Sequence, residues 1–503
     1  MAEIPMQSFG FDNTYARELP GTYAPGKPAT APAPRLLFAN LALAEELGLP
    51  AEVLQGPDAA ALFAGNLLPP DAEPIAQAYA GHQFGGFSPQ LGDGRALLLG
   101  ELIDRAGQRR DIAFKGSGRT PFSRGGDGKA AVGPMLREVL MGEAMHALGI
   151  RTTRALAVAA TGELVRRETA LPGAVLTRVA ASHLRVGSFQ FFAARGELDM
   201  LGRLADYTIA RHDPDLIGAP DRQLGFLRAV AERQARLVAQ WLNVGFIHGV
   251  MNTDNMALSG ETIDYGPCAF MEAYDPAAVF SSIDHNGRYA YANQPAIAHW
   301  NLARFAETLL PLMADADDEP AIERAVADAM EVIDAFPTAL DGALLAGQRH
   351  KLGLFAATPA DDAADAALAA DWLTLLHTQA VDFTLAWRLL ASAAEGQPEP
   401  LRDRFADRAA LDAWLARWQA RCASDGMPGA ERAQRMRRAS PAIIPRNHLV
   451  EEALAAATAG DLAPFEALLA VLRNPWDEAA LLTRYAAPAA TDVTAGYRTF
   501  CGT

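Results

Sequence analysis

Apolar and polar positions alternate differently in the two parts of this chain. In the first part, Arg95–Ile103 and Arg110–Lys115 have the composition of β-strands, and Asp104–Gln108 between them suits a hairpin turn. Two further strand-like runs, Ala155–Ala159 and Ala174–Val179, are expected to complete a small sheet. The first part is therefore predicted to be rich in strands.

Helical periodicity is the main pattern of the second part, with one earlier helix. Apolar residues recur at helical spacing over Val132–Leu148, and again over the long run Leu224–Leu242. Gly245 is a plausible C-terminal cap for the second of these helices. Most of residues 320–480 is rich in Ala and Leu and is predicted to be helical.

Three segments break these patterns. Residues 21–34 are rich in Pro, Ala and Gly and predict an extended arm rather than a packed element. Residues 81–94 and 116–133 are rich in Gly, and they flank the two predicted strands of the hairpin. Loops of this kind act either as turns or as phosphate-binding backbone, because glycine lets backbone N–H groups approach an anion.

Composition narrows the classes of function. The 503 residues are 50% hydrophobic and 21% charged, as in soluble globular proteins. A net charge of -16 without any basic run argues against nucleic-acid binding. The chain has no apolar stretch long enough for a bilayer, no secretory signal at its start, and only three cysteines. We expect a cytoplasmic enzyme with neither a nucleic-acid nor a membrane partner.

The strongest chemical signal is the stretch from His248 to Asn255, followed by Asp264-Tyr-Gly266. Asn and Asp oxygens on adjacent loops are suitable ligands for Mg²⁺ bound together with substrate phosphates. His248 and Asn255 fit the protein-kinase pattern, but Val250 stands where a kinase has its catalytic Asp. The pattern predicts a metal–nucleotide site that does not run ordinary protein phosphorylation.

Lys115 is the first of the candidate partners of this site. It ends a predicted strand directly before Gly116-Ser-Gly118, where a lysine can contact nucleotide phosphates or simply lie in solvent. A glutamate of the next helix is expected to pair with it, as in kinases. Helical spacing leaves Glu138 and Glu143 both open, because each lies in or beside the apolar stripe.

Two arginines and one carboxylate complete the candidates. Arg178 and Arg185 are seven residues apart, so a helix would present them on one face as a phosphate clamp; a pair of surface arginines is equally compatible with the spacing. Asp254, beside Asn255, is the nearest carboxylate that could accept a proton in place of the missing base. A loop or helix-capping role for Asp254 is the alternative.

Taken together, these motifs resemble the selenoprotein O family of protein adenylyltransferases. The resemblance covers nearly the whole chain and includes YAGHQFGGFSPQLGDGRA, DIAFKGSGRTPFSRGGDGKA, HGVMNTDNM and DYGPCAFMEAYDP. It implies an α+β fold with the two lobes of a protein kinase: a small antiparallel lobe with one key helix, then a mainly helical lobe with a helical extension. The implied division is 1–80 for an N-terminal extension, 81–190 and 191–350 for the lobes, and 351–503 for the extension and tail.

The resemblance also implies an activity. It is the transfer of AMP from ATP, or of UMP from UTP, to Ser, Thr or Tyr hydroxyls of target proteins with Mg²⁺ or Mn²⁺, on a nucleotide bound in the reverse sense to a kinase. Asn255 and Asp264 match the metal ligands, Asp254 the proton acceptor, and Glu138 the partner of Lys115. The positions that match the nucleotide-binding residues are Gly92, Gly94, Arg95, Lys115, Asp127, Gly128, Arg178, Arg185 and Asp264.

The cysteines add one expectation from the resemblance. Bacterial relatives look able to join a tail cysteine to the segment after Asp264, which implies a reversible disulfide between Cys268 and Cys501. Two unpaired cytosolic thiols are the alternative. Cys422 falls in helical sequence and is expected to be a small buried hydrophobic residue.

Two other functions remain open at this stage. One is a kinase of proteins or small molecules that works without the usual Asp, and the other is an inactive pseudokinase that binds ATP as a scaffold. Val250 disfavours the usual kinase chemistry. Lys115, Asn255 and Asp264 are all present and argue against an inactive site.

Overall fold

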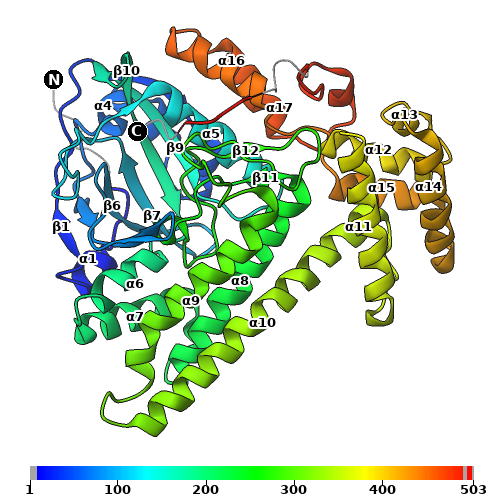
Figure 1. Cartoon of the computed structure of the whole chain (residues 1–503). Coiled ribbons are helices and arrows are strands. Elements are labelled where there is room, and N and C mark those ends of the chain that lie inside the picture. The colour runs from blue at the N-terminus through cyan, green and yellow to red at the C-terminus, as the bar shows by residue number, and fades with distance from the viewer. Residues whose placement is uncertain (1–7, 491–495, 501–503) are drawn as a thin grey trace.

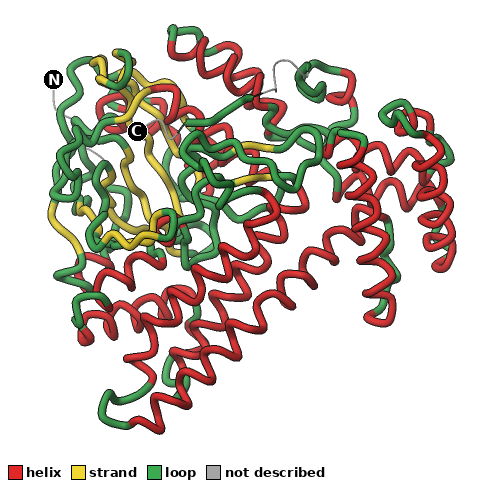
Figure 2. Tube along the Cα trace, in the orientation of Figure 1, coloured by secondary structure: helices red, strands yellow, loops and turns green. Residues whose placement is uncertain are grey.

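The computed structural model describes residues 8–490 and 496–500 and has an α+β fold. Figure 2 shows the strands gathered on one side of the molecule, with helices forming most of the remainder. The main sheet is antiparallel throughout. Its strands lie in the order β1 (Tyr23–Pro25), β3 (Ile75–Gln77), β6 (Ala96–Ile103), β7 (Arg109–Lys115), β10 (Ala170–Ala180), β9 (Arg154–Arg166) and β2 (Arg35–Ala39), with β8 (Ala130–Ala131) paired to β10.

The two faces of this sheet pack against different helices. Successive side chains of a strand point to opposite faces. Ile112 and Phe114 of β7 join a core with residues of α2 (Leu41–Glu46), α3 (Ala51–Gln55) and α4 (Ala59–Phe63), whereas Ala113 joins the core that contains α5 (Val132–Ala147). Lys115 therefore emerges on the face of the sheet that α5 covers.

The helical region follows in sequence and partly returns to the sheet. The long helices α8, α9 and α10 pack together, and α16 and α17 lie against α5 (Figure 1). The remaining helices are α1 (Thr14–Glu18), α6 (Val186–Ala193), α7 (Leu198–His212), α8 (Arg222–Val244), α9 (Gln294–Met313), α10 (Glu319–Leu352), α11 (Asp362–Thr378), α12 (Phe383–Ala394), α13 (Glu399–Arg402), α14 (Arg408–Cys422), α15 (Gly429–Ala439), α16 (Asn447–Thr458) and α17 (Ala463–Leu472).

Two small hairpins complete the description. One pairs β4 (Gly81–Gln83) with β5 (Gly86–Ser88), and the other pairs β11 (Phe246–Ile247) with β12 (Ala269–Phe270). The second brings the loop after Ile247 close to the segment before Ala269, so the two candidate metal-binding loops become neighbours. No helix within residues 8–490 and 496–500 is long and apolar enough to cross a membrane.

Most of the predicted elements are confirmed, and one is wrong. The hairpin strands, the helix over Val132–Leu148 and the left-handed Gly245 cap (φ 74°) are present. Residues 21–34, predicted to be an extended arm outside any packed element, contain β1, which pairs with β3 of the sheet. Proline at the end of this short edge strand is tolerated, since an edge strand does not need every backbone N–H for pairing.

Candidate active site

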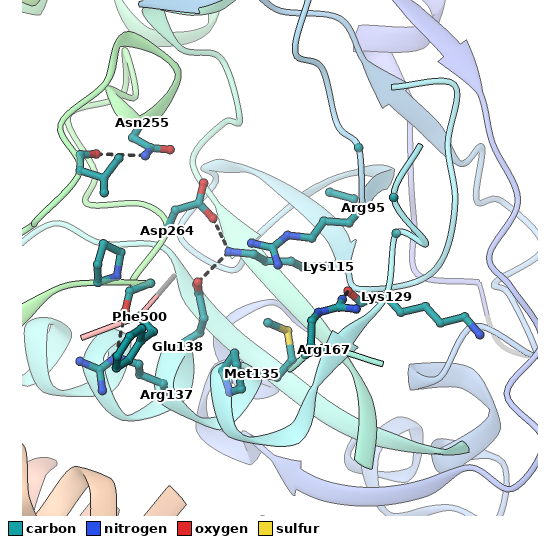
Figure 3. A pocket seen from close by; sticks show the side chains of 18 of the residues that line it. Arg95, Lys115, Lys129, Met135, Arg137, Glu138, Arg167, Asn255, Asp264 and Phe500 are labelled. Carbon is teal, nitrogen blue, oxygen red and sulfur yellow. Dashed lines mark hydrogen bonds and ion pairs between the residues drawn. The ribbon is translucent and has the colours of Figure 1, made fainter. Parts of the chain in front are cut away.

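A cavity of about 1330 Å³ opens between the sheet, α5 and the loops that carry the candidate metal ligands. Figure 3 shows Lys115, Glu138, Asn255 and Asp264 together in this cavity, with Arg95, Lys129 and Arg167 further along its wall. Both glycine-rich segments line it, and so do residues of α16 and of the C-terminal tail. Segments far apart in the sequence therefore meet here.

At the centre, Lys115 joins two acidic residues. Its Nζ donates to Glu138 Oε1 at 2.7 Å and also to Asp264 Oδ1. Glu143 instead binds Arg154 Nε at 2.9 Å and Arg473 Nη2 at 3.0 Å. The choice that helical spacing left open is thus settled: Glu138 pairs with Lys115, and Glu143 holds other elements together.

Arg178 reaches the same carboxylate from the neighbouring strand. Its Nη1 donates to Asp264 Oδ1 at 2.7 Å, so two cations contact a single oxygen. Arg178 lies on β10 opposite Ala113 of β7, which puts its side chain on the face of Lys115. The helix that would have placed Arg178 and Arg185 on one face is absent, because Arg178 is in a strand.

Arg185 approaches the site from the N-cap position of α6. Its guanidinium lies over the ring of Tyr79, 4.3 Å from the centroid, and its Nη1 donates to the backbone oxygen of Asp254 at 3.1 Å. Its buried Nη2 has no hydrogen-bond partner among the described residues. Asp93 Oδ1 lies 4.0 Å from this nitrogen, within the range of an ion pair but too far for a hydrogen bond. Since Arg185 lines the cavity, a buried guanidinium N–H without a hydrogen-bond acceptor is suited to receive an anionic ligand.

The carboxylate of Asp264 is held ionised. Burial alone would raise its pKa, but Lys115, Arg178 and Arg185 outweigh burial and keep the pKa well below the usual value. Its backbone has a φ of 63°, which is uncommon for a residue other than glycine. A strained, ionised carboxylate at the centre of a cavity is a typical feature of a functional site.

Asn255 and Asp264 fit a magnesium ion that is bound mainly by substrate and water. The Asn255 amide donates from Nδ2 to Val250 O at 3.0 Å, which fixes its orientation. No cluster of three or more His, Cys, Asp or Glu side chains suited to a metal occurs in the described ranges 8–490 and 496–500. One amide and one carboxylate oxygen are hard donors, and Mg²⁺ usually takes few protein ligands beside phosphates.

Asp254 differs from Asp264 in its surroundings. Gln83 Nε2 lies 3.3 Å from its Oδ2, and its buried Oδ1 has no hydrogen-bond partner in the described part of the chain. Burial raises the pKa of this carboxyl to about 6, although Arg185 acts in the opposite direction. A carboxylate with a pKa near 6 is better matched to accepting a proton near neutral pH than an ordinary one.

The glycine-rich segments form one wall of the cavity. Gly92 has a φ of 71°, and a Cβ at Gly128, whose φ is 68°, would lie only 2.1 Å from Gly118 O. Both positions therefore need glycine for the loops to pack on each other. Asp127 is half exposed and pairs with Arg167 at 3.0 Å. Arg95 also lines the cavity, beside Lys115.

His248 is buried beneath the loop instead of in the cavity. Its Nε2 is 2.9 Å from Ile263 O, and burial lowers the pKa of its imidazole. This geometry supports a packing role for His248. Val250, in the position of the kinase base, lines the cavity and supplies no polar side chain.

The C-terminal tail lies against the segment after Asp264. Thr499 Oγ1 donates to Pro267 O at 2.6 Å, and Thr499 N donates to Phe280 O at 2.8 Å. Cys268 is buried next to this contact, and burial raises the pKa of its thiol to about 12, against the effect of Arg137. Cys501 lies outside the described residues. Cys422 is buried, as predicted.

Several residues of the site escaped the sequence analysis. Arg137 donates to Gly266 O at 3.1 Å and to Cys268 O at 2.5 Å, and thereby fixes the segment after Asp264 to α5. Tyr79, Arg167 and Glu451 also line the cavity. Arg137 precedes Glu138 and could have been singled out as a charge at a buried helical position. Tyr79 begins the motif YAGHQFGGFSPQLGDGRA, whereas no sequence pattern pointed to Arg167 or Glu451.

The comparisons with known proteins agree with this geometry. The family model described as "Protein adenylyltransferase SelO" matches residues 5–473. A "Protein nucleotidyltransferase YdiU" of Chromobacterium violaceum is 62% identical over 486 residues, covering 96% of this chain and 100% of the relative. Proteins of the same name from Cereibacter sphaeroides and a Mycobacterium species are 60% and 58% identical, each covering 99% of this chain and 100% of the relative.

The cavity is rich in cationic side chains and large enough for a nucleotide. The curated relatives that match this chain over their full length are nucleotidyltransferases. Together these findings define the protein as a nucleotidyltransferase. The chain belongs to the SelO family of protein adenylyltransferases.

Proposed function

We propose that this enzyme transfers AMP from ATP to Ser, Thr or Tyr hydroxyls of target proteins and releases pyrophosphate, with UMP from UTP as a second donor. One observation carries the proposal: Lys115 and Arg178 contact one oxygen of Asp264, and Arg185 lies near enough to lower the pKa of the same carboxyl. Three cations exceed the single lysine that a kinase offers to its phosphates. They suit a triphosphate whose terminal phosphate is buried deep in the site.

Each residue has a distinct role in this proposal. Asn255 and Asp264 would hold Mg²⁺, or Mn²⁺, which neutralises phosphate charge as pyrophosphate leaves. Lys115, oriented by Glu138, would move from Asp264 to the phosphates together with Arg178, and Arg185 would use its Nη2, which makes no hydrogen bond in the described part of the chain. Asp254 would accept the proton of the attacking hydroxyl.

The nucleotide-binding positions on the wall follow from the same assignment. We assign Gly92, Gly94, Arg95, Asp127 and Gly128 to contacts with the nucleotide, since all five line the cavity. Phosphate contacts from backbone N–H groups are the expected mode for the glycines.

The proposal includes a kinase-like arrangement of the chain. Residues 81–190 would form the nucleotide-binding lobe, 191–350 the helical lobe, and 351–503 the extension. The antiparallel sheet followed by helices supports this division. Residues 1–80 would form an N-terminal extension, whose strands β1, β2 and β3 add to the sheet of the first lobe. A cytoplasmic location belongs to the same proposal.

A reversible Cys268–Cys501 disulfide is a further part of the proposal. The contact of Thr499 with Pro267 supports it, because residue 499 is two positions from Cys501 and Pro267 precedes Cys268. Such a bond would tie the tail to the segment that carries Asp264. Cytosolic disulfides that do form are usually redox-sensing.

Labelled ATP tests the reaction directly. The enzyme is incubated with Mg²⁺, acceptor proteins from a cell extract, and ATP labelled at either the α- or the γ-phosphate. Transfer from the α position alone is expected. Transfer from the γ position alone would instead make the enzyme a kinase, and transfer from neither would make it an ATP-binding scaffold.

A further inference from the structure

Behind Arg178 lies a buried chain of polar groups that the proposed reaction does not use. Arg178 Nε is 3.2 Å from His183 Nε2, and His183 Nδ1 is 2.9 Å from Asp111 Oδ2. All three side chains are 4% exposed or less. Asp111 lies on β7, the strand that ends in Lys115, so one strand carries Lys115 and also supports Arg178 through His183.

The contacts fix the protonation of the histidine. An arginine Nε–H can only donate, so His183 Nε2 must be the accepting nitrogen and carries no proton. The ring proton is therefore on Nδ1, from which it is donated to Asp111. Burial lowers the pKa of His183, in keeping with a neutral ring, while burial of Asp111 is outweighed by Arg211 and His183, which lower its pKa to about 2.

His183 also reaches the second arginine, through its backbone. Arg185 Nε donates to His183 O at 3.0 Å, and His183 N donates to Asp111 Oδ2 at 2.9 Å. Arg185 and Arg178 therefore share one support, located in the short connection between β10 and α6. Arg211 holds the other oxygen of Asp111 and also Ala181 O, which fixes this connection from the side of α7.

A purely structural role does not account for the imidazole ring. Asp111 is already satisfied by Arg211 and by the backbone N–H of His183, so its charge does not require a further donor. The ring adds one feature that the rest of the network lacks, an uncharged acceptor directed at Arg178 Nε. A guanidinium held at Nε keeps its Nη atoms in a fixed plane.

We propose that His183 is a positioning residue: its ring, held by Asp111, fixes the Arg178 guanidinium for the triphosphate, and its carbonyl fixes Arg185. This role rests on the proposed function, because only the proposed function gives Arg178 and Arg185 a nucleotide to bind. Because long side chains lose rotamer freedom when they bind a ligand, a guanidinium that is oriented beforehand binds phosphate more tightly.

Two substitutions separate positioning from packing. His183→Gln can keep an acceptor near the position of Nε2 and loses the donor at the Nδ1 position, whereas His183→Asn keeps that donor and loses the acceptor. Affinity for MgATP is measured by calorimetry. Removing a hydrogen bond of a charged group is expected to weaken binding about tenfold in His183→Asn, and much less in His183→Gln. Equal losses in the two variants, or a larger loss in His183→Gln, would overturn the proposal.

Two further variants serve as controls. His212→Asn changes a partly buried histidine, whose Nε2 is 2.8 Å from Ser182 Oγ in the same connection, and is expected to bind MgATP like the unchanged enzyme. In an Arg178→Ala background, His183→Asn should have no additional effect, because its action passes through Arg178. An additive loss would contradict that route. Unchanged MgATP affinity in Arg178→Ala itself would instead refute the nucleotide assignment.

A spectroscopic measurement covers the case in which His183→Asn does not fold. The unchanged enzyme is labelled with ¹⁵N-histidine, and the signals of residue 183 are assigned by their loss in His183→Gln. A non-protonated Nε2 and a protonated Nδ1 at neutral pH are expected. A protonated Nε2 would overturn the proposal, since that nitrogen could not then accept from Arg178.

Discussion

Asp254 and Asp264 are ten residues apart, and their surroundings shift the pKa values of their carboxyl groups in opposite directions. Burial raises the pKa of Asp254 to about 6, while three cations overcome burial and lower that of Asp264. Two carboxyl groups separated in this way suit different tasks, one accepting a proton and the other remaining an anion for a metal. At the scale of single residues, this contrast gives the clearest predictions.

The first prediction concerns Asp254 and pH. Its raised pKa means that ionisation disfavours the folded state, so the cost is absent below the ordinary pKa of 3.8 and complete above about pH 6. Asp254→Asn should therefore stabilise the apo protein at pH 8. The full shift corresponds to about 3 kcal/mol, and partial exposure of the side chain reduces the expected gain to about 1–2 kcal/mol. Urea unfolding in EDTA measures it.

The same substitution should abolish AMP transfer, and transfer by the unchanged enzyme should fall as the pH drops below about 6. At pH 4 the stability of Asp254→Asn and of the unchanged protein should coincide. A stability gain of equal size at pH 4 and pH 8 would show that the gain does not come from ionisation of this carboxyl.

A second prediction at this scale concerns the centre of the site. Asp264→Ala should remove detectable transfer, and Lys115→Ala should lower it by about 10²–10³-fold, as expected for the loss of a group that stabilises developing charge. Arg417→Ala, which removes an exposed ion pair with Asp371, is the control and should transfer AMP normally. Full activity in Asp264→Ala would contradict the assigned metal site.

At the scale of elements, the sequence predicts features that depend on neighbouring residues, and it leaves open contacts between distant parts of the chain. The period of apolar residues locates α5 and α8, and Gly245 marks the end of α8, because these features depend on neighbours within a few residues. The same period does not distinguish Glu138 from Glu143. Their partners, Lys115 for one and Arg154 with Arg473 for the other, come from distant parts of the chain.

The two glutamates of α5 should respond differently to neutralisation. Glu138→Gln weakens the hold on Lys115 in the site, so transfer should fall at least about tenfold while stability changes by about 1 kcal/mol or less. Glu143→Gln takes from Arg154 its buried carboxylate partner, leaving it the exposed Glu46, and it weakens the contact of Arg473, at the end of α17, with α5. It should destabilise the fold by about 2 kcal/mol and keep most of the turnover at low temperature.

Thermal unfolding and AMP-transfer rates of both variants, taken side by side, decide this prediction. The destabilisation of Glu143→Gln should also diminish in acid: burial is outweighed by Arg154 and Arg473, which lower the pKa of Glu143, so its contribution is present at neutral pH and lost as the pH falls through that pKa. Loss of transfer in Glu143→Gln, with stability intact, would reverse the two roles.

At the scale of the whole molecule, the C-terminal region returns to the site. Figure 1 shows α16 and α17 beside α5, and residues 497–500 line the cavity. Tyr497 donates to Glu451 of α16 at 2.7 Å, and Arg498 to Val279 O at 3.3 Å. The composition of residues 320–480 predicts helices but not this return, because nothing in a helical period says which distant surface a helix will cover.

The last prediction concerns the response to oxidants, which would join two distant parts of the chain, the C-terminal tail and the segment after Asp264. The thiol of Cys268 is buried with a pKa of about 12, so only a small fraction is thiolate at neutral pH. With diamide, which takes up the two electrons and two protons of the paired thiols, a Cys268–Cys501 bond should form slowly and faster at higher pH. Thr499→Val should slow it further, since Thr499 Oγ1 holds the tail at Pro267.

Peptide mapping after alkylation measures how fast the bond forms. As a control, Cys422→Ser, a change at a buried thiol in α14, should leave this rate unaltered. Alkylation of both Cys268 and Cys501 after prolonged oxidation would refute the link.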